Sequence, residues 1–93
     1  MATSCNVVVH SKVGLHARPA ALFIKTASGF SSRISVENLT RGTNPANAKS
    51  ILSVLSTGVR MGDQIRITAD GADEEAAIAA LSNLVNGNFG ETE

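Results

Sequence analysis

Gly14–Ala20 is the segment best suited to chemistry, because it places a histidine and an arginine two residues apart at a predicted helix start. Pro19 fits the first turn of a helix, where N–H groups have no intrahelical acceptor. His16 or Ala17 would then be the N-cap. The backbone N–H groups near Ala17 and Arg18, the positive end of the helix dipole and the guanidinium would all favour an anion carried by His16.

The chemistry that these residues favour is phosphoryl transfer. A histidine side chain is largely neutral near pH 7, and neutral imidazole is a good nucleophile. The helix N-terminus would keep His16 neutral before transfer and favour the phosphoryl dianion afterwards, each by roughly 0.3–1 kcal/mol. Arg18 would add charge-assisted hydrogen bonds. On spacing alone, a helix-capping role for His16 and a solvated position for Arg18 are the alternatives.

A second candidate is Ser50, at the start of another predicted helix. Its hydroxyl suits the N-cap position, where it would accept a hydrogen bond from the first turn. A phosphate there would be tolerated by the helix dipole and would add up to about two negative charges beside an exposed helix face. Ile51, Leu52 and Leu55 fit either the core or, in part, an apolar docking patch.

Size and composition limit the classes of function. The chain has 93 residues, of which 43% are hydrophobic and only three are aromatic, which predicts one domain over residues 1–93 with an aliphatic core. Cys5 and two histidines are too few for a disulfide or a closed zinc site, so we expect no metal and no cofactor. The sequence also lacks a phosphate-binding loop and a hydrolase nucleophile motif.

The charges are segregated along the chain. Residues 1–62 hold seven basic side chains and one acid, whereas residues 63–93 hold one basic side chain and seven acids. If the fold keeps these halves apart, a basic side containing His16 would attract acidic or phosphorylated partners; if packing interleaves them, the dipole cancels. Zero net charge and few aromatics argue against nucleic-acid binding. With no leader segment and an apolar run, Ala20–Ile24, too short to span a membrane, we expect a cytoplasmic protein without membrane insertion.

Hydrophobic spacing predicts the elements that position these residues. Alternating segments predict strands at 4–10, 33–37 and 64–69, with a short partner strand at 40–43. Helical spacing predicts helices at 17–28, from 47–50 to 58, and from the acidic segment 70–75 to about 86. Residues 86–93 are predicted to be a frayed polar tail. The order β-α-β-β-α-β-α predicts an α+β open-faced sandwich, a four-stranded antiparallel sheet covered on one face by three helices.

The residues Gly14-Leu15-His16-Ala17-Arg18-Pro19-Ala20 resemble the active-site signature of the HPr phosphocarrier family of the bacterial phosphoenolpyruvate:sugar phosphotransferase system. Residues 48–52, Ala-Lys-Ser-Ile-Leu, resemble the family's regulatory serine segment. Residues 69–76 resemble its last passage from strand to helix. The resemblance covers about the whole chain and implies the family fold, four antiparallel strands under three helices.

The resemblance implies a carrier protein that is itself a substrate and not an enzyme. His16 would accept a phosphoryl group on Nδ1 from phosphorylated Enzyme I and pass it to an EIIA protein, with the Arg18 side chain and the backbone of Ala17 and Arg18 binding the phosphate. Ser50 would be phosphorylated by an ATP-dependent HPr kinase, and the modified protein would bind a catabolite-control repressor. We expect a monomer. The docking face implied by position comprises Lys25, Lys49, Ile51, Leu52 and Leu55.

Three departures from the family pattern leave alternatives open. The passage 41–47 is longer than usual, which bears on recognition of Ser50 by a kinase. Val13 stands where many sugar-branch members have a small polar residue, and Lys12-Val13-Gly14 and the segment 86–90 are more similar to nitrogen-branch relatives. The alternatives are a nitrogen-branch phosphocarrier, a regulatory adaptor acting through phospho-Ser50, and a carrier for a dedicated kinase system.

Overall fold

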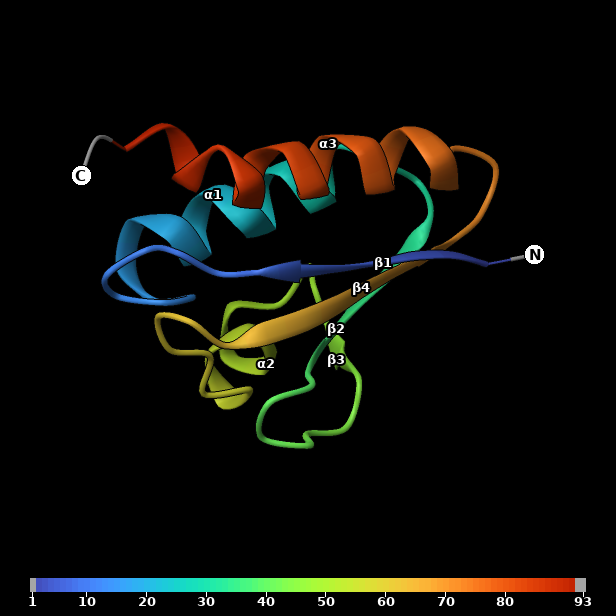
Figure 1. Ribbon diagram of the computed structural model, residues 1–93. Helices are drawn as coiled ribbons and strands as arrows, with labels where there is room; N and C mark the ends of the chain where they lie inside the picture. Colours follow the sequence, from blue (N-terminus) through green and yellow to red (C-terminus); the bar gives the residue numbers. More distant parts are fainter. Residues whose placement is uncertain (1, 92–93) are drawn as a thin grey trace.

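The computed structural model describes residues 2–91. The elements in chain order are β1 (Thr3–Val8), α1 (Ala17–Ser28), β2 (Arg33–Asn38), β3 (Ala46–Asn47), α2 (Ile51–Ser56), β4 (Gln64–Asp70), α3 (Glu74–Asn86) and the 3₁₀ helix η1 (Asn88–Gly90). The strands pair antiparallel in the order β1-β4-β2-β3. Figure 1 shows α1 and α3 side by side along the sheet. The predicted open-faced sandwich is confirmed.

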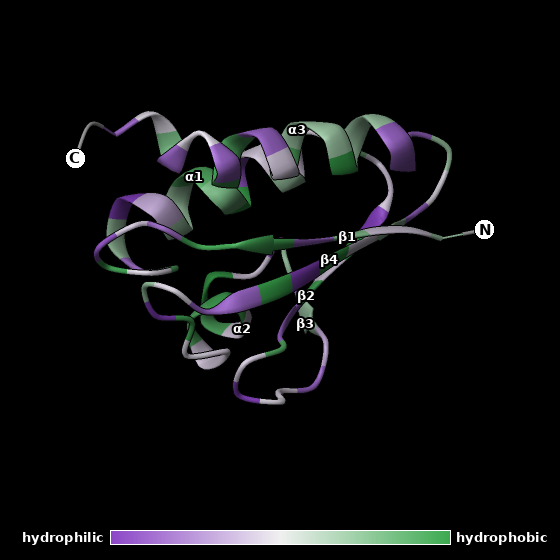
Figure 2. Ribbon diagram, viewed as in Figure 1, coloured by the Kyte–Doolittle hydropathy of each residue, from purple (hydrophilic) through white to green (hydrophobic). Residues whose placement is uncertain are grey.

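The sheet separates an apolar face from a polar one, because successive side chains on a strand point to opposite sides. On β4, Ile65, Ile67 and Ala69 are fully buried, whereas Arg66 and Thr68 on the other face are partly exposed. β2 shows the same alternation. Figure 2 shows hydrophobic and hydrophilic residues mixed along α1 and α3, as expected for helices with one face on the sheet.

The helices complete the core with small, aliphatic and aromatic residues. Ala20, Phe23 and Ala27 of α1 are fully buried at helical spacing, and α3 packs on β1 and β4 through a similar stripe. The predicted bounds of α1, 17–28, agree with the structure. No helix within residues 2–91 is both long enough and apolar enough to cross a membrane.

The short partner strand predicted at 40–43 is wrong. The N–H groups of Gly42 and Thr43 both donate to the Asn38 carbonyl, at 2.8 and 3.1 Å, so the chain turns there and makes no ladder. The edge strand that pairs with β2 comes later, at Ala46–Asn47, on the side of β2 away from β4. Gly42 has a φ of +71°, which suits a turn and not a strand.

The acidic residues before α3 hold the start of β2 in place. The Asp73 carboxylate accepts the N–H groups of Ser31 and Ser32, at 2.8 and 2.9 Å, and also the Ser32 hydroxyl. These hydrogen bonds, with the Ser32 hydroxyl contributing most, lower the pKa of Asp73 to about 2. Although Asp73 is the N-cap of α3, its side chain therefore stabilises a neighbouring loop and not its own helix.

The segment after α3 is more ordered than the predicted frayed tail. Asn88–Gly90 forms a 3₁₀ turn, and Phe89 is 1% exposed and joins the core cluster. The polar composition of residues 86–91 concealed this turn, because a single apolar side chain supplies the packing. Thr92 and Glu93 lie outside the described residues.

Candidate functional site

His16 lies at the N-terminus of α1 with its side chain exposed. Its backbone is extended, with φ −141° and ψ 164°, as expected for an N-cap residue. The imidazole makes no capping hydrogen bond to the helix. The alternative of a side-chain cap is therefore not what the structure shows, and the ring is accessible to a partner protein.

The next residue, Ala17, has an unusual backbone. Its φ of +51° is in the left-handed region, which costs an alanine about 1–2 kcal/mol relative to the ordinary helical region. The helix continues normally beyond it, with the Ala20 N–H donating to the His16 carbonyl at 3.4 Å. Strain of this kind gathers at functional sites, where the surrounding structure compensates for it. Sequence spacing alone gave no sign of it.

Arg18 extends from the first turn of α1 toward the segment after α3. Its Nη1 donates to the Phe89 carbonyl at 3.3 Å and lies 3.7 Å from the Glu91 carboxylate. The Arg18 side chain is 61% exposed, and an exposed ion pair of this kind contributes only about 0.2–1 kcal/mol. These contacts keep the guanidinium near the start of α1. They are weak enough for an anion of higher charge than the Glu91 carboxylate to replace them. Neither Phe89 nor Glu91 was recognised from the sequence.

The loop before His16 rests on the turn at residues 59–63. Gly14 has a φ of +65°, and a Cβ there would lie 2.1 Å from the Val59 carbonyl oxygen. The Leu15 N–H donates to the same oxygen at 3.2 Å. Only glycine fits this approach, so Gly14 fixes the position from which His16 extends.

The same turn is held by a buried carboxylate that the sequence did not reveal. Asp63, 5% exposed, accepts the Arg60 N–H, the Asn38 amide and the Arg41 Nε, at 3.0, 3.1 and 3.0 Å. These contacts, the Arg60 N–H foremost, lower the pKa of Asp63. Asn38 is fully buried and also donates to the Thr57 carbonyl at 3.0 Å. The network links the turn at residues 38–43 to the turn at residues 59–63, which supports the histidine loop.

Ser50 is the N-cap of α2, as its spacing predicts. Its hydroxyl oxygen accepts the Ser53 N–H at 3.4 Å, a long hydrogen bond. α2 covers Ile51–Ser56 and is shorter than the predicted range. Ile51 and Leu52 are 46% and 78% exposed, so they are not core residues, whereas Leu55 is partly buried.

Exposed apolar side chains also occur in the histidine loop and in the turn that supports it. The large hydrophobic side chains exposed within residues 2–91 are Val13, Ile51, Leu52 and Met61. Val13 lies in the loop before His16, and Met61 lies in the turn that supports it. Neither was among the docking residues predicted from the sequence.

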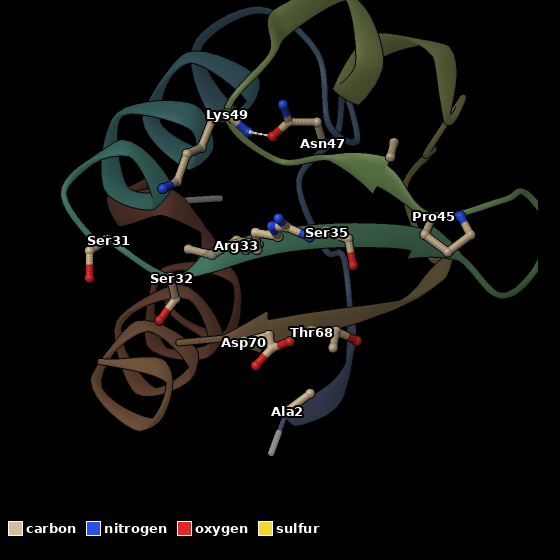
Figure 3. Close-up of a pocket in the computed structure, with 12 residues that line it drawn as sticks. Ala2, Ser31, Ser32, Arg33, Ser35, Pro45, Asn47, Lys49, Thr68 and Asp70 are labelled. Carbon is tan, nitrogen blue, oxygen red and sulfur yellow. Dashed lines mark hydrogen bonds between the residues drawn. The ribbon is translucent and has the colours of Figure 1, made fainter. Parts of the chain in front are cut away.

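The two predicted docking lysines lie in different surroundings. Lys25 is exposed in the last turn of α1. The Lys49 ammonium donates to the Phe30 carbonyl at 2.7 Å, just after the end of α1. Lys49 also lines a hollow of about 580 Å³ on the uncovered face of the sheet, beside Arg33 and Asp70 (Figure 3). Neither His16 nor Arg18 lines that hollow.

A smaller cavity of about 370 Å³ adjoins the helix start. Its lining residues are Ser11, Lys12, Val13, Ala17, Arg18, Pro19 and Glu91. It is therefore formed by the histidine loop, the first turn of α1 and the C-terminal segment. Within residues 2–91, no group of three His, Cys, Asp or Glu side chains could hold a metal ion.

The two oppositely charged halves of the chain are interleaved. Three ion pairs, Arg18–Glu91, Arg41–Asp63 and Arg66–Glu37, each join a residue before position 63 to one after position 62. Of the two arrangements that the sequence allowed, these pairs support interleaving, and an acid lies next to Arg18.

Comparison with known proteins identifies the family. A family model described as the PTS HPr component phosphorylation site matches residues 3–87. The chain belongs to the HPr family. HPr-C-His from Thermoanaerobacter tengcongensis, a crystal structure, is 46% identical, with a TM-score of 0.91 over 98% of this chain and 99% of that one. Phosphocarrier protein HPr of Neisseria meningitidis serogroup A is 40% identical over 88 residues, which are 95% of this chain and 96% of that protein.

A longer relative shares the same HPr region. The multiphosphoryl transfer protein of Escherichia coli O157:H7 is 40% identical over 88 residues, and the chain spans only 23% of the length of that protein. Membership of the HPr family confirms the resemblance stated from the sequence. The family model is described as the HPr component of the PTS, and relatives that the chain covers almost completely are named phosphocarrier proteins.

Proposed function

We propose that the chain carries a phosphoryl group on His16, receiving it from phosphorylated Enzyme I and delivering it to an EIIA protein of the sugar phosphotransferase system. The observation that carries this proposal is the exposed imidazole at the N-terminus of α1, in a member of a phosphocarrier family. An accessible ring is what a relay needs, because two different proteins must approach it in turn.

The transfer from phosphorylated Enzyme I requires no group beyond the two proteins. The lone pair of His16 Nδ1 attacks phosphorus as the bond from phosphorus to the donor atom of Enzyme I breaks, and the bonding electrons return to that donor. The reverse exchange passes the group to EIIA. Phosphoryl transition states are loose, so catalysis here consists of alignment and charge stabilisation.

Arg18 and the helix start supply that charge stabilisation. The free N–H groups of the first turn and the dipole of α1 favour a dianion near Ala17 and Arg18. The guanidinium would leave its weak contacts with Phe89 and Glu91 and donate to the phosphoryl oxygens. Arg18 thus acts on the product side of the transfer, when the negative charge has arrived.

The docking face we propose surrounds His16. The exposed side chains of Ile51 and Leu52 support this assignment, together with Leu55 and Lys25. Lys49 is the weakest member, because its ammonium is already bound to the Phe30 carbonyl. An apolar patch beside a cationic site suits partners that carry acidic and apolar groups together.

A second function, regulation through Ser50, rests on its place in α2. The hydroxyl makes only a long capping hydrogen bond, and exposed Ile51 and Leu52 follow directly. Phosphorylation by HPr kinase would add about two negative charges to this patch and create a surface for a catabolite-control repressor. Incubation with ATP and HPr kinase tests this role, with Ser50→Ala as the control; absence of a Ser50-dependent label would exclude it.

The relay itself is tested by transfer to EIIA. In a mixture of phosphoenolpyruvate, Mg²⁺, Enzyme I and EIIA, we expect EIIA to be phosphorylated only when this chain is present. His16→Ala should abolish the transfer, and His10→Ala, which alters the other exposed histidine, should retain it. Parallel reactions with sugar-branch and nitrogen-branch EIIA distinguish the two routes. Efficient transfer by the His16→Ala variant would contradict the proposal.

A further inference from the structure

The loop before His16 is attached at both of its ends to the turn that supports it. At the first end, the Val9 N–H donates to the Asp63 carbonyl at 2.9 Å. At the second end, the Leu15 N–H donates to the Val59 carbonyl at 3.2 Å. Because Leu15 directly precedes His16 in the chain, a displacement of the supporting turn would also displace the imidazole.

A single carboxylate oxygen holds that turn together. Asp63 Oδ2 accepts the Arg60 N–H at 3.0 Å, and the Asp63 N–H donates to the Arg60 carbonyl, also at 3.0 Å. The same Oδ2 accepts the Asn38 amide at 3.1 Å and the Arg41 Nε at 3.0 Å. Asp63 is 5% exposed. Removal of this buried oxygen would take an acceptor from all three donors, and the turn would have to rearrange to satisfy them.

The turn at residues 38–43 keeps the Arg41 side chain within reach of Asp63. The Arg41 N–H donates to the Asn38 side-chain oxygen at 3.2 Å. The Thr43 hydroxyl oxygen accepts the Asn38 N–H at 2.9 Å. A turn at the surface thus takes part in the support of the histidine loop.

We propose that Asp63 is a positioning residue for phosphoryl transfer, whose carboxylate fixes the turn at residues 59–63 and thereby the direction of the His16 imidazole. This inference rests on the proposed function. Transfer needs the lone pair of Nδ1 in line with the bond from phosphorus to Enzyme I that breaks, and a misplacement of about 1 Å can slow such a step by up to about a hundredfold. Asp63 exerts this effect through Val59 and Leu15, so it needs no contact with a partner protein or with the phosphoryl group.

The test is single-turnover transfer from isolated phosphorylated Enzyme I, measured by rapid quench over a series of concentrations of this chain. The maximal rate constant reports on the alignment of His16, whereas the half-saturating concentration reports on docking. We expect Asp63→Ala to lower the maximal rate constant by about tenfold or more and to change the half-saturating concentration by less than about twofold. Asp63→Asn should restore most of the wild-type rate, because its amide oxygen can accept the same donors.

Asp73→Ala is the matched control. The Asp73 carboxylate also accepts three hydrogen bonds, but their donors are in Ser31 and Ser32, beyond the opposite end of α1 from His16. We expect this variant to lose stability and to keep the wild-type maximal rate constant. An equal fall in Asp73→Ala would overturn the inference, because general destabilisation would explain both. Wild-type kinetics in Asp63→Ala, or a change in its half-saturating concentration alone, would overturn it too.

Arg41→Ala and hydrogen exchange keep the inference testable if Asp63→Ala does not fold. Arg41→Ala removes one of the donors to Asp63 and should lower the maximal rate constant by about twofold or more. Exchange of the Leu15 amide, measured without Enzyme I, should be faster in Arg41→Ala and unchanged in Asp73→Ala. Wild-type rate and wild-type exchange in Arg41→Ala would overturn the inference. If wild-type His16 accepts no phosphoryl group, the proposed function fails, and the exchange measurement still shows whether the network holds the loop.

Discussion

At the scale of single residues, the site depends on backbone positions that restrict the choice of side chain. Gly14 touches the Val59 carbonyl so closely that any Cβ would collide with it, and Ala17 occupies a left-handed conformation at the helix start. Both positions determine the direction in which the His16 side chain projects from the backbone. The geometry of the site is therefore set as much by its neighbours as by the histidine.

Gly14→Ala tests this dependence. Gly42→Ala is the matched control, because Gly42 has a similar φ of +71° but open space where a Cβ would lie. We expect Gly42→Ala to lower the free energy of unfolding by about 1–2 kcal/mol, from backbone strain alone. Gly14→Ala should cost about 1–3 kcal/mol more, from the collision. Equal losses of stability in urea unfolding would contradict the close approach to Val59.

The sequence indicated the candidate site residues but not the contacts that hold them in place. His16, Arg18 and Ser50 lie at helix starts that capping rules and Pro19 make visible. Asp63 and Asn38, by contrast, meet across 25 positions of the chain. No local pattern marks such a contact, because it exists only once the strands have paired.

At the scale of elements, α1 and the C-terminal segment form the site together. Arg18 reaches from one to the other, through the Phe89 carbonyl and the Glu91 carboxylate. Figure 1 shows the segment after α3 lying near the start of α1. The buried Phe89 anchors this segment, and the otherwise polar composition explains why the sequence suggested a frayed tail.

Glu91→Gln and Arg18→Ala should have opposite effects on phosphoryl acceptance. Glu91 repels an incoming dianion and competes for Arg18, so its removal should speed acceptance from Enzyme I at low salt, by up to about fivefold for a pair worth 1 kcal/mol. Salt should reduce the gain through screening. Arg18→Ala should slow acceptance without loss of folding. Rapid-quench kinetics measure both, and slower acceptance by Glu91→Gln would contradict the assigned roles.

The contact between α3 and the start of β2 predicts an acid dependence of stability. The pKa of Asp73 in the folded protein is about 2, below its ordinary value near 3.9 in an unfolded chain. Asp73 therefore contributes stability that is complete above about pH 5 and is lost as the pH falls toward about 2.

Asp73→Asn removes this contribution and provides the comparison. The difference in unfolding free energy between wild type and variant should be constant above pH 5 and should shrink between about pH 4 and about pH 2. Urea unfolding at a series of pH values measures it. A difference that stays the same down to pH 2 would show that the Ser31 and Ser32 hydrogen bonds do not depend on the ionised carboxylate.

At the scale of the whole molecule, the regular elements were predictable and the irregular connections were not. The spacing of Phe23 and Ala27 gave α1 its correct bounds, and the alternation around Ile65 and Ile67 gave β4 to within a residue. The strand Ala46–Asn47 is only two residues long, which is too short to show a period. A partner strand was therefore predicted in the turn that precedes it.

The distribution of charge over the surface was also not predictable from the sequence alone. A sequence divided into basic and acidic halves suggested either a basic face or an interleaved surface, and only the fold decides between them. Because β4, near the boundary of the halves, pairs with both β1 and β2, residues from the two halves become neighbours. Glu91 lies 3.7 Å from Arg18 at the start of α1, so the charge of the site is a property of the complete fold.

The central claim, that His16 is the phosphoryl acceptor, is tested most directly by intact mass after incubation with phosphoenolpyruvate, Mg²⁺ and Enzyme I. We expect the wild type and His10→Ala each to gain the mass of one phosphoryl group and to lose it in acid, as a phosphohistidine does. His16→Ala should gain no mass. An undiminished gain in His16→Ala, or an acid-stable product in the wild type, would contradict the account.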